Sequence, residues 1–319
     1  MRVLITGASG FAGTYLARAC ANSGDEVFGA SRRGELPAEV GEGVAVDLRD
    51  LDAVRRLLAE LEPQVVYHLA ALSSVGRSWD EPATTVQDNV ATAVNMLEAL
   101  RLDRPGARVV WAGTCESYGP PSRLPVTEDA PLNPANPYAV SKTAGDLLAA
   151  VYVDAHGLDL VPARPFNHAG PGQLPIFIVS SLAQQAAQAN VSGESPIRIV
   201  TGNPDTRRDF TDVRDVVHAY RLLAEHGRAG EVYNVCSGQS ISAADQIAVL
   251  GELVAPAAVE HVIDQARVRA HEVMDLRGAN DRILADTGWH PEIPFRQTML
   301  DTLRWWEHEL RQSATGVRN

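Results

Sequence analysis

Short apolar runs rich in β-branched residues alternate with amphipathic stretches through the first half of the chain. The runs are typical of buried strands and cover residues 3–5, 26–30, 44–46, 65–69, 108–112 and 158–163. The stretches between them carry apolar residues at helical spacing, at 11–21, 51–61, 84–100 and 137–155. Strands and helices that alternate in this way predict an α/β fold, in which helices cover both faces of a doubly wound parallel sheet.

The pattern changes after Arg164. A Gly/Pro-rich turn at 167–173 precedes a predicted helix at 175–189, a loop-rich segment at 191–208, a late strand at 231–236 that returns to the main sheet, and an amphipathic helix at 295–310. We therefore expect two interleaved domains. The first contains residues 1–166 and about 209–238, and a smaller C-terminal α/β lobe contains 167–208 and 239–319.

Charge and cysteine content argue against several classes of protein. Of 319 residues, 40 are acidic and 28 are basic, so the formal net charge is −12. A nucleic-acid or anionic-membrane partner needs a basic face, so neither is expected. Three widely spaced cysteines give no disulfide framework, and His261 and His271 lack neighbours at metal-ligand spacing, so we predict no metal. No apolar run reaches membrane-spanning length and no leader precedes the first strand, so we expect a cytoplasmic protein.

The turn after the first strand is rich in glycine. Gly7, Gly10 and Gly13 lie where a Rossmann-type fold needs residues without side chains, for a tight turn, for close approach of a pyrophosphate and for helix–strand packing. Phe11 and Ala12 then begin the helix, whose amino end attracts phosphate. Any tight turn uses glycine, but the position directly after the first strand favours dinucleotide binding.

The end of the second strand indicates which dinucleotide is used. An acidic residue there favours a free ribose 2′-hydroxyl, whereas arginine accommodates a 2′-phosphate. Here Ser31 is followed by Arg32 and Arg33, so NADP(H) is favoured and NAD(H) stays possible. Asp47 is a candidate for the adenine side. We expect further cofactor contacts at the neighbouring strand ends, from Leu48, Leu69, Ala70 and Ala71.

A tyrosine and a lysine share one face of the predicted helix at 137–155. Tyr138 and Lys142 lie four residues apart, and a neighbouring ammonium stabilises phenolate, so we expect the pKa of Tyr138 to fall. Such a tyrosine can interconvert an alcohol and a ketone. A surface helix pair would show the same spacing, but this one lies downstream of a dinucleotide turn. The strand at 108–112 runs into Thr114, at the edge of the sheet where ligands bind.

Taken together, the glycine turn, Thr114 and the Tyr138–Lys142 pair resemble the extended short-chain dehydrogenases/reductases, which act on nucleotide sugars. The resemblance covers essentially the whole chain. It implies that Thr114 hydrogen-bonds the sugar, that Tyr138 is the catalytic acid/base, and that Lys142 tunes Tyr138 and holds the nicotinamide ribose. It also implies that the first domain binds NADP, that the lobe binds the nucleotide sugar, and that Ser73 contacts substrate.

Two later segments narrow the resemblance. Residues 164–173 are similar to the RPFNHxGPGQ run of GDP-4-keto-6-deoxymannose reductases, and residues 208–215 to their RDFTDVRD run. By this resemblance Asn167 and Arg208 contact the diphosphate of the sugar nucleotide, and His168 lies near the nicotinamide. Arg269 and Glu272 match an Arg-Pro-x-Glu run that also contacts substrate, except that Ala270 replaces the proline.

The resemblance implies a reductase that uses NADPH to reduce the C4 ketone of a GDP-4-keto-6-deoxy-hexose. The alternative is a redox-neutral 4,6-dehydratase or epimerase with a tightly bound cofactor. Glu116 is the discriminating residue, because the dehydratases use a glutamate here to move the C5 proton, whereas in a reductase it would bind a sugar hydroxyl. Cys115 is interpreted as a packing residue.

The resemblance also implies a homodimer. In this family the helices equivalent to 84–100 and 137–155 pair across a two-fold axis into a four-helix bundle. The first of them places six apolar residues on one face, which could equally be plain core: Val86, Val90, Ala93, Val94, Leu97 and Leu100.

Overall fold

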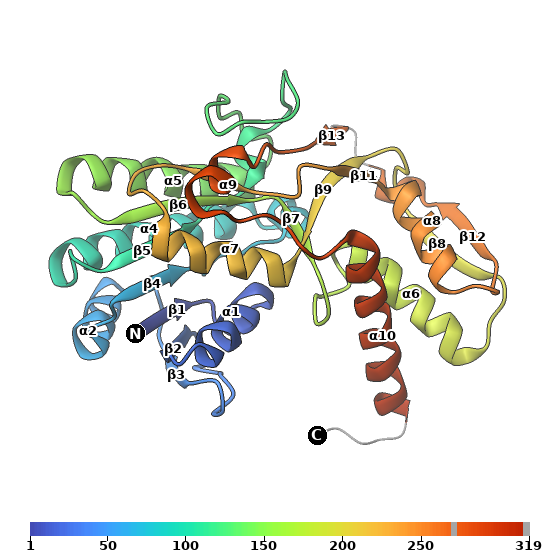
Figure 1. The fold of residues 1–319 in the computed structure, drawn as a ribbon, viewed down its shortest axis with the longest axis horizontal. Helices are drawn as coiled ribbons and strands as arrows, with labels where there is room; N and C mark the ends of the chain where they lie inside the picture. The colour runs from blue at the N-terminus through green and yellow to red at the C-terminus, as the bar shows by residue number, and fades with distance from the viewer. Residues whose placement is uncertain (269–272, 315–319) are drawn as a thin grey trace. The chain divides into compact units, whose positions relative to one another are not determined.

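The structure is a computed structural model that describes residues 1–268 and 273–314. The chain divides into two compact units (Figure 1). The first consists of Met1–Phe166, Val216–Val235 and Gly278–His290, and the second of Asn167–Asp215, Cys236–Arg277 and Pro291–Asn319. Among the described residues, no helix is both long enough and apolar enough to cross a lipid bilayer.

A seven-stranded, fully parallel sheet forms the centre of the first unit. Its strand order is β10-β6-β5-β4-β1-β2-β3. The chain therefore builds outward from β1 in one direction and then returns to add β4 on the other side of it. The bounds are β1 Arg2–Thr6, β2 Glu26–Ser31, β3 Glu42–Ala45, β4 Val65–His68, β5 Arg108–Ala112, β6 Leu160–Pro165 and β10 Tyr233–Val235. This confirms the predicted α/β, Rossmann-type fold.

Helices cover both faces of this sheet (Figure 1). On one face α2 (Leu51–Leu61), α4 (Pro82–Asp103) and α5 (Pro137–His156) pack over a buried cluster that includes Leu4, Val109 and Trp111. On the other face lie α1 (Phe11–Asn22) and α7 (Val213–His226). The short elements are α3 (Val75–Asp80), a 3₁₀ turn η1 (Cys115–Tyr118) and α9 (Asp281–Thr287).

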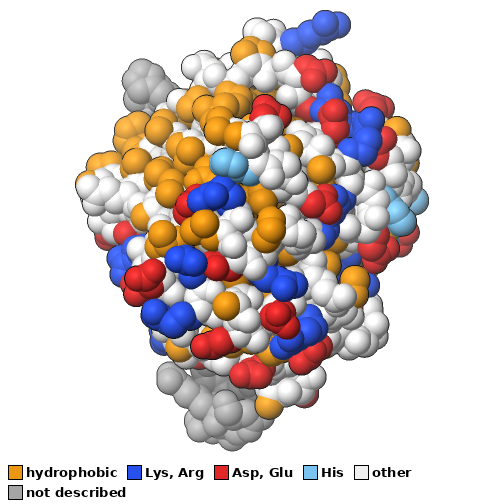
Figure 2. Space-filling view, turned by 90° about the vertical axis from the view of Figure 1, so that its left-hand side faces the viewer, with side chains coloured by type: hydrophobic (Ala, Val, Ile, Leu, Met, Phe, Trp, Pro, Cys, Tyr) orange, Lys and Arg blue, Asp and Glu red, His pale blue; other side chains and the backbone are white. Residues whose placement is uncertain are grey.

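The outer face of α4 and α5 leaves apolar side chains in contact with solvent. Val94, which the helical pattern placed on the buried face, is 36% exposed, because α4 buries a neighbouring stripe that includes Ala93 and Leu97. Figure 2 is viewed from the side where α4 and α5 are labelled in Figure 1, and it shows hydrophobic side chains gathered on this surface. The exposed apolar residues of the two helices include Val94, Leu102, Val140, Leu147 and Val151.

The second unit is built from short strands and three helices. β9 (Arg207–Asp212) pairs with β7 (Asn167–Ala169), β11 (Ser240–Ser242) and β13 (Asp275–Leu276). β8 (Ile197–Thr201) pairs with β12 (Val259–Ile263), which is followed by the 3₁₀ turn η2 (Gln265–Arg267). The helices α6 (Ile178–Ser192), α8 (Ala243–Leu253) and α10 (Phe295–Ala314) enclose a core that includes Leu182, Leu250 and Met299.

Several expectations for the later segments were wrong. The segment 191–208 was expected to be loop-rich, but it contains β8 and the start of β9, and the turn at 167–173 begins with β7. These strands pair with partners far along the chain, and no local pattern reports such pairing. Residues 209–215 lie in the second unit and 278–290 in the first. Arg282 explains the latter, because it bridges Asp129 at 3.0 Å and Glu231 at 3.2 Å within the first unit.

Candidate active site

The turn between β1 and α1 has the geometry that a bound pyrophosphate requires. Gly7 has a φ of +74°, and a Cβ there would lie 3.0 Å from the backbone nitrogen of Ala70. A Cβ on Gly13 would collide with the carbonyl oxygen of Gly7. Gly10 caps α1 without a side chain, and the first turn, which begins Phe11–Ala12, contains no acidic residue. The amino end of α1 is thus left for an external anion.

The ends of β1 and β4 are tied together where the strand order reverses. The backbone nitrogen of Ala70 donates to the hydroxyl of Thr6 at 3.2 Å, and that of Leu69 donates to the carbonyl of Thr6 at 3.2 Å. Ala71 follows in the same partly buried loop, whereas Ser73 is exposed. Ligands of open α/β sheets bind at such a reversal, outside the carboxyl ends of the strands.

His68 is the buried end of β4. Its Nδ1 lies 3.0 Å from the hydroxyl of Thr6, and its ring stacks on Trp111 with centroids 4.4 Å apart. Burial, and to a lesser extent the charge of Lys142, lowers the pKa of His68 to about 3. The ring is therefore neutral in the folded protein, and its Nδ1 shares a hydrogen bond with the Thr6 hydroxyl, which also accepts from Ala70. His68 therefore serves the packing of the site.

Three arginines lie near the ends of β2 and β3, and they differ in their partners. Arg49 pairs with Asp47 at 2.7 Å and holds the pKa of that carboxyl down at about 2. Arg33 pairs with Glu35 at 2.8 Å. Arg32 has no ion pair with any described residue, so its charge is available to an external anion.

The neighbouring predicted residues support the loops of this region. The hydroxyl of Ser31 accepts from the backbone nitrogen of Gly34 at 3.0 Å. Leu48 is buried, and its carbonyl accepts from the side-chain amide of Asn95 at 3.0 Å.

Thr114 and Glu116 lie directly beyond β5. Thr114 is 6% exposed, and its hydroxyl caps η1 by accepting from the backbone nitrogen of Glu116 at 3.2 Å. The carboxylate of Glu116 accepts from the side-chain amide of Asn136 at 3.0 Å. Cys115 is buried between them.

Tyr138 and Lys142 lie on the first turns of α5. They are 9% and 8% exposed, respectively. Asn136 caps the helix by accepting from the backbone nitrogen of Ala139 at 2.8 Å, and Pro137 occupies its first turn. This cap fixes the start of α5 and therefore the placement of Tyr138. The same Asn136 side chain also holds the carboxylate of Glu116.

The expected fall in the pKa of Tyr138 was wrong. Burial raises the pKa of its phenol, and the hydrogen bond with Thr114 opposes that rise only in part. The ammonium of Lys142 is itself buried, and burial lowers its pKa while the charge of Asp146 acts against this. Tyr138 is therefore a protonated phenol, the form that donates a proton to a nascent alkoxide.

Sequence reasoning missed the side chains that hold this helix in place. The amide of Asn89 on α4 donates to the hydroxyl of Ser141 at 2.9 Å and accepts from the backbone nitrogen of Leu72 at 2.7 Å. Ser141 in turn donates to the carbonyl of Tyr138 at 2.7 Å. A polar residue inside an apolar helical stripe is the signal that would have identified Asn89, and an asparagine before a proline is the signal for Asn136.

In the second unit, Asn167 and His168 lie on β7, and Arg208 lies on the neighbouring strand β9. Gln173 donates to the carbonyl of His168 at 2.8 Å and fixes the turn that follows. The three arginines of 207–214 differ in their partners. Arg207 pairs with Asp245 at 3.2 Å, and Arg214 pairs with Asp212 at 2.8 Å and with Asp301 at 2.7 Å. Among described residues Arg208 bonds only carbonyl oxygens, including that of Val273 at 2.6 Å, so its charge is not cancelled.

Two predicted substrate residues, Arg269 and Glu272, lie outside the described residues. Within the described part of the chain, no group of three or more histidine, cysteine, aspartate or glutamate side chains is arranged to hold a metal ion.

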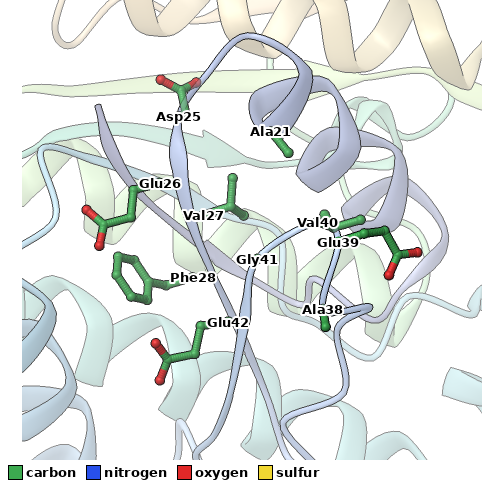
Figure 3. A pocket seen from close by; sticks show the side chains of 10 residues that line it. All are labelled: Ala21, Asp25, Glu26, Val27, Phe28, Ala38, Glu39, Val40, Gly41 and Glu42. Carbon is green, nitrogen blue, oxygen red and sulfur yellow. The ribbon is translucent and has the colours of Figure 1, made fainter.

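A pocket of about 360 Å³ lies at the amino ends of two strands of the first unit's sheet, whereas the residues described above lie at the carboxyl ends (Figure 3). It opens where β2 and β3 begin and is lined by Ala21 and the segments 25–28 and 38–42. Four of its side chains are carboxylates and none is basic, which disfavours an anionic nucleotide: Asp25, Glu26, Glu39 and Glu42. The carboxyl ends of the strands, where Gly7, Thr114 and Tyr138 gather, are the candidate site instead.

Comparison with known proteins identifies the family. The family described as GDP-mannose 4,6 dehydratase matches residues 4–302. This chain belongs to that family. The GDP-6-deoxy-D-mannose reductase of Pseudomonas aeruginosa is 36% identical over 98% of this chain and 99% of its own length. The UDP-glucose 4-epimerase of Mycolicibacterium smegmatis is 32% identical over 97% of this chain and 99% of its own.

A solved structure agrees with the sequence comparisons. RMD from Pseudomonas aeruginosa complexed with NADPH aligns with a TM-score of 0.85 and 34% identity, over 97% of this chain and 100% of that one. The family member described here thus has the extended short-chain dehydrogenase/reductase fold, and it is an enzyme of the oxidoreductase type.

Proposed function

We propose that this enzyme uses NADPH to reduce the C4 ketone of a GDP-4-keto-6-deoxy-hexose, most closely GDP-4-keto-6-deoxymannose, to the GDP-6-deoxy-hexose. The observation that carries the proposal is the buried, protonated phenol of Tyr138, hydrogen-bonded to Thr114, at the carboxyl end of the sheet. The full-length similarity to a GDP-6-deoxy-D-mannose reductase supports this choice of substrate.

Reduction of a ketone requires a hydride at carbon and a proton at oxygen. When bound, reduced nicotinamide supplies the hydride. Tyr138 donates its phenol proton to the carbonyl oxygen as negative charge develops there, and solvent later restores that proton. Thr114 orients the phenol through their hydrogen bond and offers its hydroxyl to the same oxygen. Lys142 holds the nicotinamide ribose, and its positive charge stabilises the phenolate that is left behind.

We propose that the first unit binds the cofactor. Gly7, Gly10 and Gly13 allow the pyrophosphate to approach the amino end of α1, next to Phe11 and Ala12. Arg32 contacts the 2′-phosphate of NADPH, because it is the arginine of this region that forms no ion pair with a described carboxylate. Further contacts are assigned to Ser31, Arg33, Asp47, Leu48 and the loop 69–71.

The second unit then binds the nucleotide sugar. Arg208 and Asn167 contact the diphosphate, and an arginine that, in the described part of the chain, bonds carbonyl oxygens and no carboxylate keeps its charge for this purpose. This resolves how a chain with a net charge of −12 attracts a dianionic substrate. His168 is assigned to the nicotinamide side and Ser73 of the first unit to the sugar.

Glu116 is assigned to a sugar hydroxyl rather than to proton abstraction at C5. Its carboxylate is held by the Asn136 amide, which also caps the catalytic helix, so the side chain has a fixed orientation as a hydrogen-bond acceptor.

We also propose that the enzyme is a cytoplasmic homodimer. The exposed apolar side chains of α4 and α5, Val94, Val140, Leu147 and Val151 among them, fit a four-helix bundle between two copies. Cys20, Cys115 and Cys236 are all buried thiols, as in proteins of a reducing compartment. Sedimentation of Leu147→Glu as a monomer, against a wild-type dimer, would support this bundle.

Absorbance at 340 nm tests the reaction. Purified enzyme with NADPH and GDP-4-keto-6-deoxymannose is expected to consume one NADPH per sugar. No absorbance loss, with NADP(H) retained on the protein through gel filtration, would contradict the proposal and favour a redox-neutral enzyme. GDP-mannose would then be the first alternative substrate, and incorporation of solvent deuterium at C5 the readout.

A further inference from the structure

A second buried charge lies one helical turn beyond Lys142. Asp146 is 5% exposed, and its Oδ2 accepts from Nε of Arg164 on β6 at 3.0 Å. Arg164 also donates to the phenol oxygen of Tyr118 at 3.1 Å and stacks over its ring. A buried ion pair often contributes little net stability, because both charges lose their hydration. Its presence beside a catalytic helix therefore calls for a functional explanation.

The carboxylate of Asp146 also lies against the backbone of Gly113, which precedes Thr114 directly beyond β5. A Cβ on Gly113, directly after β5, would lie 2.7 Å from both carboxylate oxygens, so a larger residue there would have to displace the carboxylate. Oδ1 is buried and has no hydrogen-bond partner among the described residues. Arg164 on one side and the backbone of Gly113 on the other thus hold an ionised carboxylate on the same face of α5 as Lys142.

Asp146 is the negative charge that acts on Lys142. Burial disfavours the ammonium, and only the charge of Asp146 acts in the opposite direction. Two other titratable groups of the first unit carry no charge. His68 on β4 is neutral, and Tyr138 on α5 itself is a protonated phenol. From η1, Glu116 is engaged by Asn136. No described residue forms an ion pair or hydrogen bond with the Lys142 ammonium.

Arg164 has the complementary effect on Asp146. Burial alone would protonate that carboxyl, and the guanidinium of Arg164, with a smaller contribution from Lys142, acts against this. Arg164 thus favours the ionised form of Asp146, and the charge of Asp146 in turn favours the ammonium of Lys142.

We infer that Asp146, held by Arg164 and Gly113, is a positioning residue that keeps the Lys142 side chain charged. The charged lysine would serve the cofactor ribose and Tyr138, and only this part of the inference rests on the proposed function. The titration of Lys142 itself needs neither cofactor nor substrate.

One feature of the composition makes this titration directly measurable. Lys142 is the only lysine in the chain. Protein grown with lysine labelled with ¹³C at Cε therefore gives one side-chain NMR signal, and its shift against pH reports the protonation of this residue alone. Wild type is compared with Asp146→Asn, with the conservative Asp146→Glu, and with Tyr118→Phe, which removes the phenol that Arg164 contacts but leaves Asp146 unchanged.

Asp146→Asn is expected to lower the titration midpoint of Lys142 by about one pH unit or more, which is a tenfold change in proton affinity. Asp146→Glu restores most of it, and Tyr118→Phe leaves it at the wild-type value. The fluorescence-measured affinity for NADPH in Asp146→Asn falls at pH values between the two midpoints. A midpoint in Asp146→Asn equal to that of wild type would overturn the inference.

Asp146→Asn leaves Arg164 as an uncompensated buried cation, so this variant alone is not a sufficient test if it fails to fold. The double variant Asp146→Asn/Arg164→Gln removes that cation, and Gly113→Ala displaces the carboxylate without changing any charge. Both are expected to lower the Lys142 midpoint, and a wild-type midpoint in both would also overturn the inference. Failure of wild type to oxidise NADPH with the keto sugar would refute the proposed reaction and leave this result standing.

Discussion

The first unit carries Tyr138 and Lys142 on α5 and Thr114 directly beyond β5, and it buries all three, whereas the second carries Asn167 and Arg208 on short strands and leaves both partly exposed. In the first unit a chain of hydrogen bonds through Asn136, Asn89 and Ser141 holds the start of the catalytic helix. In the second, the hydrogen bonds of Arg208 with described residues go to backbone carbonyls.

The difference fits the roles that we propose for the two units. Proton transfer depends on the orientation of a single phenol and on a desolvated charge beside it, so its side chains need a rigid, buried frame. Recognition of a diphosphate depends on a positive charge that no carboxylate cancels, so its arginine needs solvent access and neutral partners. The predictions below test this division, beginning with the largest expected effect.

Removal of the phenol should have the largest effect. Tyr138→Phe is expected to lower kcat by roughly 10²- to 10⁴-fold, because the general acid is lost, while NADPH affinity changes little. Stopped-flow absorbance at 340 nm measures the first quantity and cofactor fluorescence the second. Tyr152→Phe is the matched control on the same helix, since its hydroxyl donates to Glu98 at 3.0 Å, and it should keep wild-type kcat.

The next effect concerns the second unit. Arg208→Ala is expected to raise KM for the nucleotide sugar by roughly 10- to 100-fold, with a smaller change in kcat, because a charged hydrogen bond to phosphate is lost. Arg207→Ala is the control, since Asp245 already cancels that charge. Steady-state kinetics with saturating NADPH measure both. Equal increases in KM for the two variants would refute the role assigned to Arg208.

The next, smaller effect concerns the relative affinity of the enzyme for NADPH and NADH. Arg32→Ala is expected to weaken binding of NADPH by about tenfold and leave NADH unaffected, because a contact to the 2′-phosphate is removed. Arg33→Ala, whose charge Glu35 neutralises, serves as the control. Titration with both cofactors provides the measurement. An equal loss of affinity for NADPH and NADH in Arg32→Ala would place Arg32 elsewhere than at the 2′-phosphate.

The smallest predicted effect is on stability and concerns the buried frame itself. The pKa of His68 is about 3 in the folded protein, below the ordinary 6.5, so as pH falls the unfolded state takes up the proton first. The free energy of unfolding should therefore fall as pH drops through 6.5, by about 1 kcal/mol between pH 6.5 and 5.5. Urea unfolding at pH 7.5 and 5.5 should show a shallower dependence in His68→Gln, and an unchanged dependence would contradict this account.

Local patterns predicted most of the first unit. The helix at 51–61 and the strand at 108–112 have the bounds of α2 and β5, because apolar spacing, Asp50 at the helix start and a β-branched run all act over a few residues. The positions of Gly7, Thr114, Tyr138 and Lys142 followed from motifs of the same short range. The small strands β7, β8 and β9 were missed, because their partners lie far along the chain.

The sequence by itself determined the alternation of strands and helices, the glycine turn, and which residue types carry the chemistry, because each of these depends on neighbours within a few positions. The tertiary structure alone decided the electrostatics. Burial reverses the expected direction of the Tyr138 pKa, and Asp146 meets Arg164 from another strand. It also decided which arginines are neutralised and which keep their charge. Burial and ion pairing join residues distant in sequence, so no local pattern reports them.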